Sequence, residues 1–217
     1  MPETMAAVSG SGHAGLIVQL RGLDVITELK MDRRTQRTRS ALMSAFVELL
    51  LGRGYGGITV EDIVTCANVG RSTFYMHYAG KEDILKQSLR RPSAHLADIV
   101  GSGRSPDLLI PVLGHFREQQ KINGMFFAWP VRGVWVESLA ELIELRLNAL
   151  ARKTRARPIV PPAMIARQIS EAQISLIAHW LAGRISCRPN AIAEALVAST
   201  DAIVLALLRG GAPALAK

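Results

Sequence analysis

Apolar residues recur at helical spacing from Thr35 onward. They occupy every third or fourth position, which places them along one face of an α-helix. This face consists of Leu42, Ala45, Phe46, Leu49 and Leu50. The glycine-rich run 53–57 follows, and glycine readily adopts the left-handed conformation that ends a helix. The sequence therefore predicts a first long helix that ends near Arg53.

A second, shorter helix is predicted to begin at Thr59. Asp62 lies three residues further on, which is the spacing of a capping box, where each of two residues hydrogen-bonds through its side chain to the backbone of the other. The helix is expected to end at the turn Asn68-Val69-Gly70, because asparagine tolerates a positive φ and glycine allows a cap.

The rest of the chain is also predicted to be helical. A short helix over Arg71–His77 follows the turn, and another begins at Lys81. Further helices are predicted over residues 106–120, 121–130, 133–153, 163–185 and 189–209, with prolines between them. No segment alternates convincingly between apolar and polar residues as a strand does, and aromatic residues make up 5% of the chain. We therefore predict an all-α fold.

Basic residues outnumber acidic ones. The chain has 26 Lys and Arg against 18 Asp and Glu, a formal net charge of +8 and a pI of about 10.1. Such an excess favours an anionic partner, either nucleic acid or a membrane surface. One basic cluster falls within residues 30–39 and a second within residues 152–157. For the second cluster, a solvated surface and a binding surface are both open interpretations.

Several classes of protein are disfavoured by composition. Cys66 and Cys187 are too few for a disulfide scaffold or a cysteine-based zinc site, and they fit a reducing cytoplasm. We expect no segment apolar enough to cross a bilayer, and a cytoplasmic location. None of the phosphate-binding, metallopeptidase or serine-hydrolase motifs occurs. We therefore expect no catalytic residue, no metal and no cofactor, and a protein that is not an enzyme.

The two short helices and the turn between them form a helix-turn-helix pattern. In this motif the second helix enters the major groove of DNA, while the first crosses the backbone. Val69 and Phe74 are expected to bury the turn against the preceding helix. The residues left to face outward are Arg71, Ser72, Thr73, Tyr75, Met76 and His77.

At these positions the sequence resembles the TetR family of transcriptional regulators. The matching elements lie between Thr38 and Leu85, without a gap. They read Thr38-Arg39, Arg53-Gly54-Tyr55, Thr59-Val60, Asp62-Ile63, Thr73-Phe74-Tyr75, His77-Tyr78 and Lys81-Glu82. The resemblance implies a DNA-binding domain followed by a domain for ligand binding and dimerisation. We assign a flexible arm to residues 1–33, the helix-turn-helix domain to 34–80 and the helical effector-binding and dimerisation domain to 81–217.

The resemblance also implies which residues contact DNA. Phosphate contacts are expected from Thr59, Tyr75, His77 and Lys81, and base contacts from Arg71, Ser72, Thr73 and Met76. Arg39, which belongs to the first basic cluster, completes this DNA-binding set. Other interpretations stay open: Tyr75 as part of the core, His77 as a helix-end residue and Lys81 as a surface charge. A lysine at a helix amino terminus opposes the helix dipole, which favours a compensating partner.

The carboxy-terminal half contains two helices with broad apolar faces, near 163–185 and 189–209. By resemblance these helices form the interface of a homodimer, which would read two halves of a palindromic operator in double-stranded DNA. The alternative is that both helices belong to the core of one chain.

The position of an effector site is implied by resemblance alone. The residues expected to line it are His115, Phe116, Gln119, Phe127, Trp129 and Trp135. Apolar and aromatic residues with a few polar groups are typical of ligand pockets, but also of an ordinary core. We predict a sequence-specific transcriptional regulator, a repressor released from its operator by an unidentified small molecule. The alternative is a basic helical protein that binds a membrane surface or a protein partner.

Overall fold

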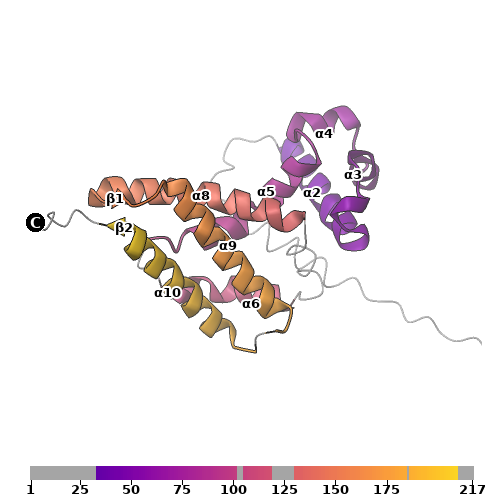
Figure 1. Cartoon of the computed structure of the whole chain (residues 1–217). Coiled ribbons are helices and arrows are strands. Elements are labelled where there is room, and N and C mark those ends of the chain that lie inside the picture. Colours follow the sequence, from indigo (N-terminus) through magenta and orange to yellow (C-terminus); the bar gives the residue numbers. More distant parts are fainter. Residues whose placement is uncertain (1–32, 102–104, 119–129, 185, 210–217) are drawn as a thin grey trace, which may run out of the picture. The chain divides into compact units, whose positions relative to one another are not determined.

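A computed structural model describes residues 33–101, 105–118, 130–184 and 186–209. The chain divides into two compact units, residues 1–84 and 85–217. Most described residues are helical (Figure 1). The all-α prediction is therefore confirmed. The predicted arm lies outside the described residues except for Arg33, which begins the first described helix.

The first unit contains the helix-turn-helix. Its elements are α2 (Arg33–Arg53), the short 3-10 helix η1 (Tyr55–Gly57), α3 (Val60–Ala67), α4 (Arg71–His77) and the first residues of α5 (Lys81–Ala97). Helix α2 packs against α3, and α3 packs against α4. The side chains that fill this core are fully buried and include Leu42, Phe46, Leu50, Ile58, Ile63 and Phe74.

Both ends of α3 have the predicted caps. The Thr59 hydroxyl accepts a hydrogen bond from the Asp62 backbone N–H at 3.1 Å, and the Asp62 carboxylate accepts one from the Thr59 N–H at 2.8 Å. At the other end Asn68 adopts the left-handed conformation, with φ 51° and ψ 50°. These local interactions fix where α3 begins and where the chain turns toward α4.

The second unit holds the remaining helices. After α5 they are η2 (Pro106–Leu108), α6 (Ile110–Glu118), α8 (Val131–Thr154), α9 (Pro162–Leu181) and α10 (Pro189–Leu207). Helices α8 and α9 lie side by side, and α10 packs against α9, α6 and η2. The single helix predicted over 106–120 is divided into η2 and α6, and the segment predicted over 121–130 lies outside the described residues except for Pro130.

A two-stranded antiparallel pair differs from the sequence prediction. Strand β1 (Arg157–Pro158) pairs with β2 (Leu208–Arg209), so the predicted helix 189–209 ends at Leu207. The pairing continues with a hydrogen bond of 2.9 Å from the Ile159 N–H to the Leu207 carbonyl. Strands of two residues are too short to show an alternating pattern, which explains why no strand could be predicted there.

Helix α10 corrects a second expectation. Among the described residues it is the one helix long and apolar enough to cross a membrane, by length and composition alone. A core helix of a soluble protein passes the same test, so one such helix is a weak indication. In this structure Ile192, Ala193 and Leu196 of α10 are buried.

Candidate nucleic-acid interface

Helix α4 is held by its turn and by one aromatic anchor. The Val69 N–H donates to the Val64 carbonyl at 2.9 Å, and Gly70 precedes the helix in an extended conformation. Phe74 is fully buried, and its ring contacts the rings of Tyr75 and Tyr78 at centroid distances of 5.3 and 5.5 Å. Phe74 therefore fixes one face of α4, and the opposite face is left to solvent.

The exposed face of α4 agrees with the set expected to face outward. Arg71, Ser72, Tyr75 and Met76 are exposed, whereas Thr73 and His77 are half-buried, and Val69 in the turn is also half-buried. Tyr75 is 48% exposed and Met76 is 80% exposed. Tyr75 is therefore a surface residue that packs one edge on the core. Contact of these side chains with DNA stays a prediction.

Arg71 is oriented by two neighbours. Its guanidinium lies 3.4 Å from the Glu61 carboxylate of α3 and 5.8 Å from the centroid of the Tyr75 ring. Both Arg71 and Glu61 are largely exposed, so this ion pair contributes little to stability. The ion pair matters for binding instead, because the Glu61 carboxylate competes with any phosphate or base for the guanidinium donors of Arg71. Sequence reasoning missed Glu61, since the two residues belong to different helices.

Thr59 is engaged in the capping box. Its hydroxyl donates to the Asp62 carboxylate at 2.5 Å, and Arg53 binds the same carboxylate at 2.9 Å. Hydrogen bonds from the Thr59 hydroxyl and backbone, with a smaller contribution from Arg53, lower the pKa of Asp62 below its ordinary value. A phosphate contact from the Thr59 hydroxyl would therefore have to share this group with the cap.

Lys81 is placed differently from a simple surface lysine. Its Nζ donates to the carbonyls of Tyr55 at 3.0 Å and Ile58 at 2.8 Å. The same Nζ lies 4.3 Å from the centroid of the Tyr55 ring, a cation–π distance. An ammonium group has three donors. Two are used here, so the predicted phosphate contact of Lys81 depends on the third.

Arg39 of α2 lies beside the end of α4. It is half-buried and hydrogen-bonds to the hydroxyl of Tyr78, which is itself buried. Burial raises the pKa of Tyr78, and the bond from Arg39 counteracts part of that increase. Arg39 therefore has an internal partner, and its predicted contact with DNA stays a prediction.

The predicted effector residues are described only in part. Phe116 and Trp135 are buried and pack edge to face, with ring centroids 5.9 Å apart. His115 lies on α6, and its side chain lies outside the described part of the structure. Gln119, Phe127 and Trp129 lie outside the described residues. The structure thus brings two of the six residues together, Phe116 and Trp135, and the effector site stays a prediction.

The described part of the chain offers little support for a metal site or a reactive cysteine. No group of three or more His, Cys, Asp or Glu side chains that could hold a metal ion occurs there. Cys66 is an exposed residue, and partial desolvation of its thiol together with the nearby Glu48 carboxylate raises the pKa of that thiol. A thiol with a raised pKa is a weaker nucleophile at neutral pH.

Comparison with known proteins gives a consistent family. Residues 42–87 match the family model described as bacterial regulatory proteins, tetR family. The chain is 42% identical over 81 residues to the uncharacterized HTH-type transcriptional regulator YxbF of Bacillus subtilis, which covers 37% of this chain and 21% of that protein. It is 40% identical over 52 residues to the HTH-type transcriptional regulator TcmR of Streptomyces glaucescens, covering 24% and 23%. The alignments therefore span less than a quarter of the length of these two relatives.

A solved structure extends the similarity beyond the amino-terminal unit. The TetR transcriptional regulator from Streptococcus agalactiae 2603V is similar with a TM-score of 0.52 and 25% identity. The match covers 78% of this chain and 96% of that one. Both the helix-turn-helix sequence and the helical fold are thus similar to those of bacterial regulatory proteins of the TetR family.

Proposed function

We propose that the chain is a DNA-binding transcriptional regulator that inserts α4 into the major groove of its operator. The observation that carries this proposal is the division of α4 into two faces. Phe74 anchors one face in the core, while Arg71, Tyr75 and Met76 lie exposed on the other. A short helix held in this way can present side chains to base edges without losing its own packing.

Charge supports the same proposal. The net charge of +8 attracts the phosphate backbone, and phosphate contacts make binding salt-dependent. Glu61 is the opposing element, because it pairs with Arg71 at 3.4 Å. DNA would replace this carboxylate as the partner of Arg71. Glu61→Gln should therefore increase affinity for duplexes of any sequence.

We also propose a homodimer that binds a palindromic operator. The exposed side chains of α10 form a stripe of mostly small residues along one face: Ala191, Ala195, Ala198, Ala202 and Leu205. On α9, Met164 is 60% exposed, and Gln168 and Ala172 are exposed on the same side. Two such helices from each of two chains would form an interface, and twofold symmetry would present two copies of α4 to two half-sites.

Regulation by a small molecule completes the proposal. A ligand bound in the second unit would favour an arrangement in which the two copies of α4 no longer fit the half-sites, which releases the repressor. The buried pair Phe116 and Trp135 supplies an aromatic wall for such a site. As a regulator of transcription the protein would act in the cytoplasm.

A mobility-shift assay tests the proposal. The probe is the DNA upstream of the protein's own coding sequence, at several salt concentrations, with excess unrelated duplex as competitor. Wild type should form a specific complex that weakens steeply with salt. Arg71→Ala should lose the specific complex, whereas Arg184→Ala, an exposed arginine of the second unit, should retain it. Absence of binding to any duplex, or binding that salt does not affect, would contradict the proposal.

A further inference from the structure

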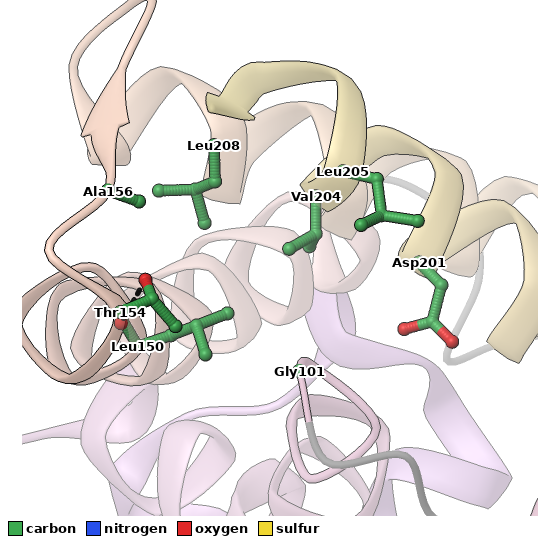
Figure 2. A pocket seen from close by; sticks show the side chains of 8 residues that line it. All are labelled: Gly101, Leu150, Thr154, Ala156, Asp201, Val204, Leu205 and Leu208. Atoms are coloured by element: carbon green, nitrogen blue, oxygen red, sulfur yellow. Dashed lines mark hydrogen bonds between the residues drawn. The ribbon is translucent and has the colours of Figure 1, made fainter. Parts of the chain in front are cut away.

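The second unit contains a cavity at the carboxy-terminal ends of α8 and α10. Its volume is about 460 Å³, within the range of small-molecule sites. It is open to solvent, and its lining comes from the turn after α5, the end of α8 with the residues before β1, and the last two turns of α10 with the start of β2 (Figure 2). The lining residues are Gly101, Leu150, Thr154, Ala156, Asp201, Val204, Leu205 and Leu208.

The interior of this cavity is mostly aliphatic. Leu150 and Leu208 face the space from opposite sides, and the hydroxyl of Thr154 is already bonded to the Leu150 carbonyl at 2.8 Å. Gly101 has φ +61°, and a Cβ there would lie 2.5 Å from Leu150 Cδ2. Glycine therefore allows the turn to approach Leu150 closely. The cavity suits an aliphatic body and offers it few hydrogen bonds.

Four cations flank this aliphatic space along the chain. Arg152, Lys153, Arg155 and Arg157, here called the α8 basic cluster, alternate with the lining residues Thr154 and Ala156. All four are exposed, and within the described ranges none has an acidic partner at ion-pair distance. The cluster is thus available to an anion beside the cavity.

The helix dipole explains only part of this cluster. Cations in the last turn of a helix stabilise it, which accounts for Arg152 and Lys153. Arg155 is the left-handed cap, with φ 54°, and Arg157 lies beyond it in β1. The register of the strand pair also sets Arg157 opposite a further arginine, Arg209. Basic residues are therefore concentrated beyond what the helix end requires.

Asp201 is the one carboxylate in the lining. In Figure 2 it lies at the opposite side of the cavity from Thr154 and Ala156. An anionic group at the basic side would avoid this carboxylate, whereas a cationic group there would face the cluster. The distribution of charge therefore selects both the sign of the ligand's head group and the side on which it binds.

We propose that this cavity binds an amphiphilic anion, with an aliphatic chain in the cavity and a carboxylate, sulfate or phosphate head on the α8 basic cluster. The site is built from residues other than those predicted for the effector, and the inference does not depend on the DNA-binding proposal. We infer a free amphiphile as the occupant, because the charged surface lies beside a cavity with room for an aliphatic chain.

Calorimetric titration of the full chain tests the chemistry of the ligand. Decanoate is the probe, used below its critical micelle concentration, with decyltrimethylammonium as the same tail with the opposite charge and acetate as the head without the tail. Decanoate should bind with one site per chain, and the other two should bind at least about tenfold more weakly.

Variants locate the site. Ala156→Phe fills the cavity, and the double variant Arg152→Gln/Arg155→Asn removes two cations while keeping a residue that tolerates the left-handed cap. Each should weaken decanoate binding by at least about tenfold. The control Arg184→Gln/Arg188→Gln makes the same change in net charge at exposed positions outside the lining and should bind like wild type. Photocrosslinking with a diazirine-bearing alkanoate should label peptides from the ends of α8 and α10.

Several results would overturn the inference. They are no decanoate binding, equal binding of the ammonium compound, or binding that neither variant weakens. Binding to vesicles of anionic phospholipid without binding of free decanoate would assign the cluster to a membrane surface instead. Because circular dichroism reports folding of each variant separately, a misfolded Ala156→Phe leaves the charge variant and the crosslink to decide.

Discussion

The ammonium group of Lys81 lies over the ring of Tyr55, 4.3 Å from its centroid. The same group donates hydrogen bonds to the carbonyls of Tyr55 and Ile58. Tyr55 and Ile58 precede α3, and Lys81 follows α4. One side chain therefore connects the two ends of the helix-turn-helix and holds them together.

This connection predicts that Lys81→Met destabilises the first unit. Methionine retains an apolar stem but lacks the donors, so two carbonyls lose their charged partner. We expect a loss of about 1 kcal/mol in the free energy of unfolding, measured by denaturant titration. Arg37→Met, which removes an exposed cation from α2, serves as the control and should change stability little. Equal stability of Lys81→Met and wild type would show that these contacts do not stabilise the first unit.

The capping box predicts a second effect. Thr59→Ala removes the hydroxyl that accepts the Asp62 N–H, which should cost about 1 kcal/mol of stability. Thr65→Ala on the same helix is the matched control, because the exposed side chain of Thr65 takes no part in the capping box and alanine favours helix. If both variants unfold at the same denaturant concentration, the cap does not hold α3.

Asp62 adds a pH dependence of known sign. Its pKa is lowered in the folded state, so the unfolded state binds a proton first as the pH falls. The stabilisation is therefore complete well above its ordinary pKa of about 3.9 and is lost as the pH falls through the lowered value. Asp62→Asn should unfold with a weaker pH dependence than wild type in this acid range. Parallel pH profiles of the two proteins would contradict the assignment.

Local signals account for what could be predicted from the sequence. The caps at Thr59 and Asn68 and the extent of Arg71–His77 depend on residues within a few positions of each other, and all three agree with the structure. Contacts between residues far apart in the sequence could not be predicted from these local signals. Lys81 binds carbonyls 23 and 26 residues away, and β1 pairs with β2 from the far end of the chain. Such contacts depend on how helices pack, which a spacing pattern does not contain.

A buried polar pair in the second unit gives a fourth prediction. Gln173 of α9 donates from Nε2 to the hydroxyl of Thr200 on α10 at 3.0 Å, and both side chains are about 1% exposed. Thr200→Val leaves this amide without its acceptor and should cost about 1–3 kcal/mol. The double variant Gln173→Met/Thr200→Val removes both partners and should recover most of that loss. Additive losses, measured by thermal unfolding of the four proteins, would exclude coupling between the two residues.

The proposed dimer predicts the effect of a charge on α10. Ala198 is exposed in the middle of the stripe of small residues, and Ala198→Arg would bury a charge between the two chains. Dimerisation should weaken by about a hundredfold or more, as measured by sedimentation velocity. Ala149→Arg places the same side chain on an exposed position of α8 and should leave the dimer intact. A dimer unaffected by Ala198→Arg would place the interface elsewhere.

The most direct measurement is a fluorescence-anisotropy titration of a labelled operator duplex with wild type and Arg71→Ala over a range of salt concentrations. We expect wild-type affinity to fall steeply as salt increases, and Arg71→Ala to lose about 1–3 kcal/mol on the operator but little on unrelated duplex. If Arg71→Ala binds the operator as tightly as wild type, or if binding is indifferent to salt, α4 is not the helix that reads DNA.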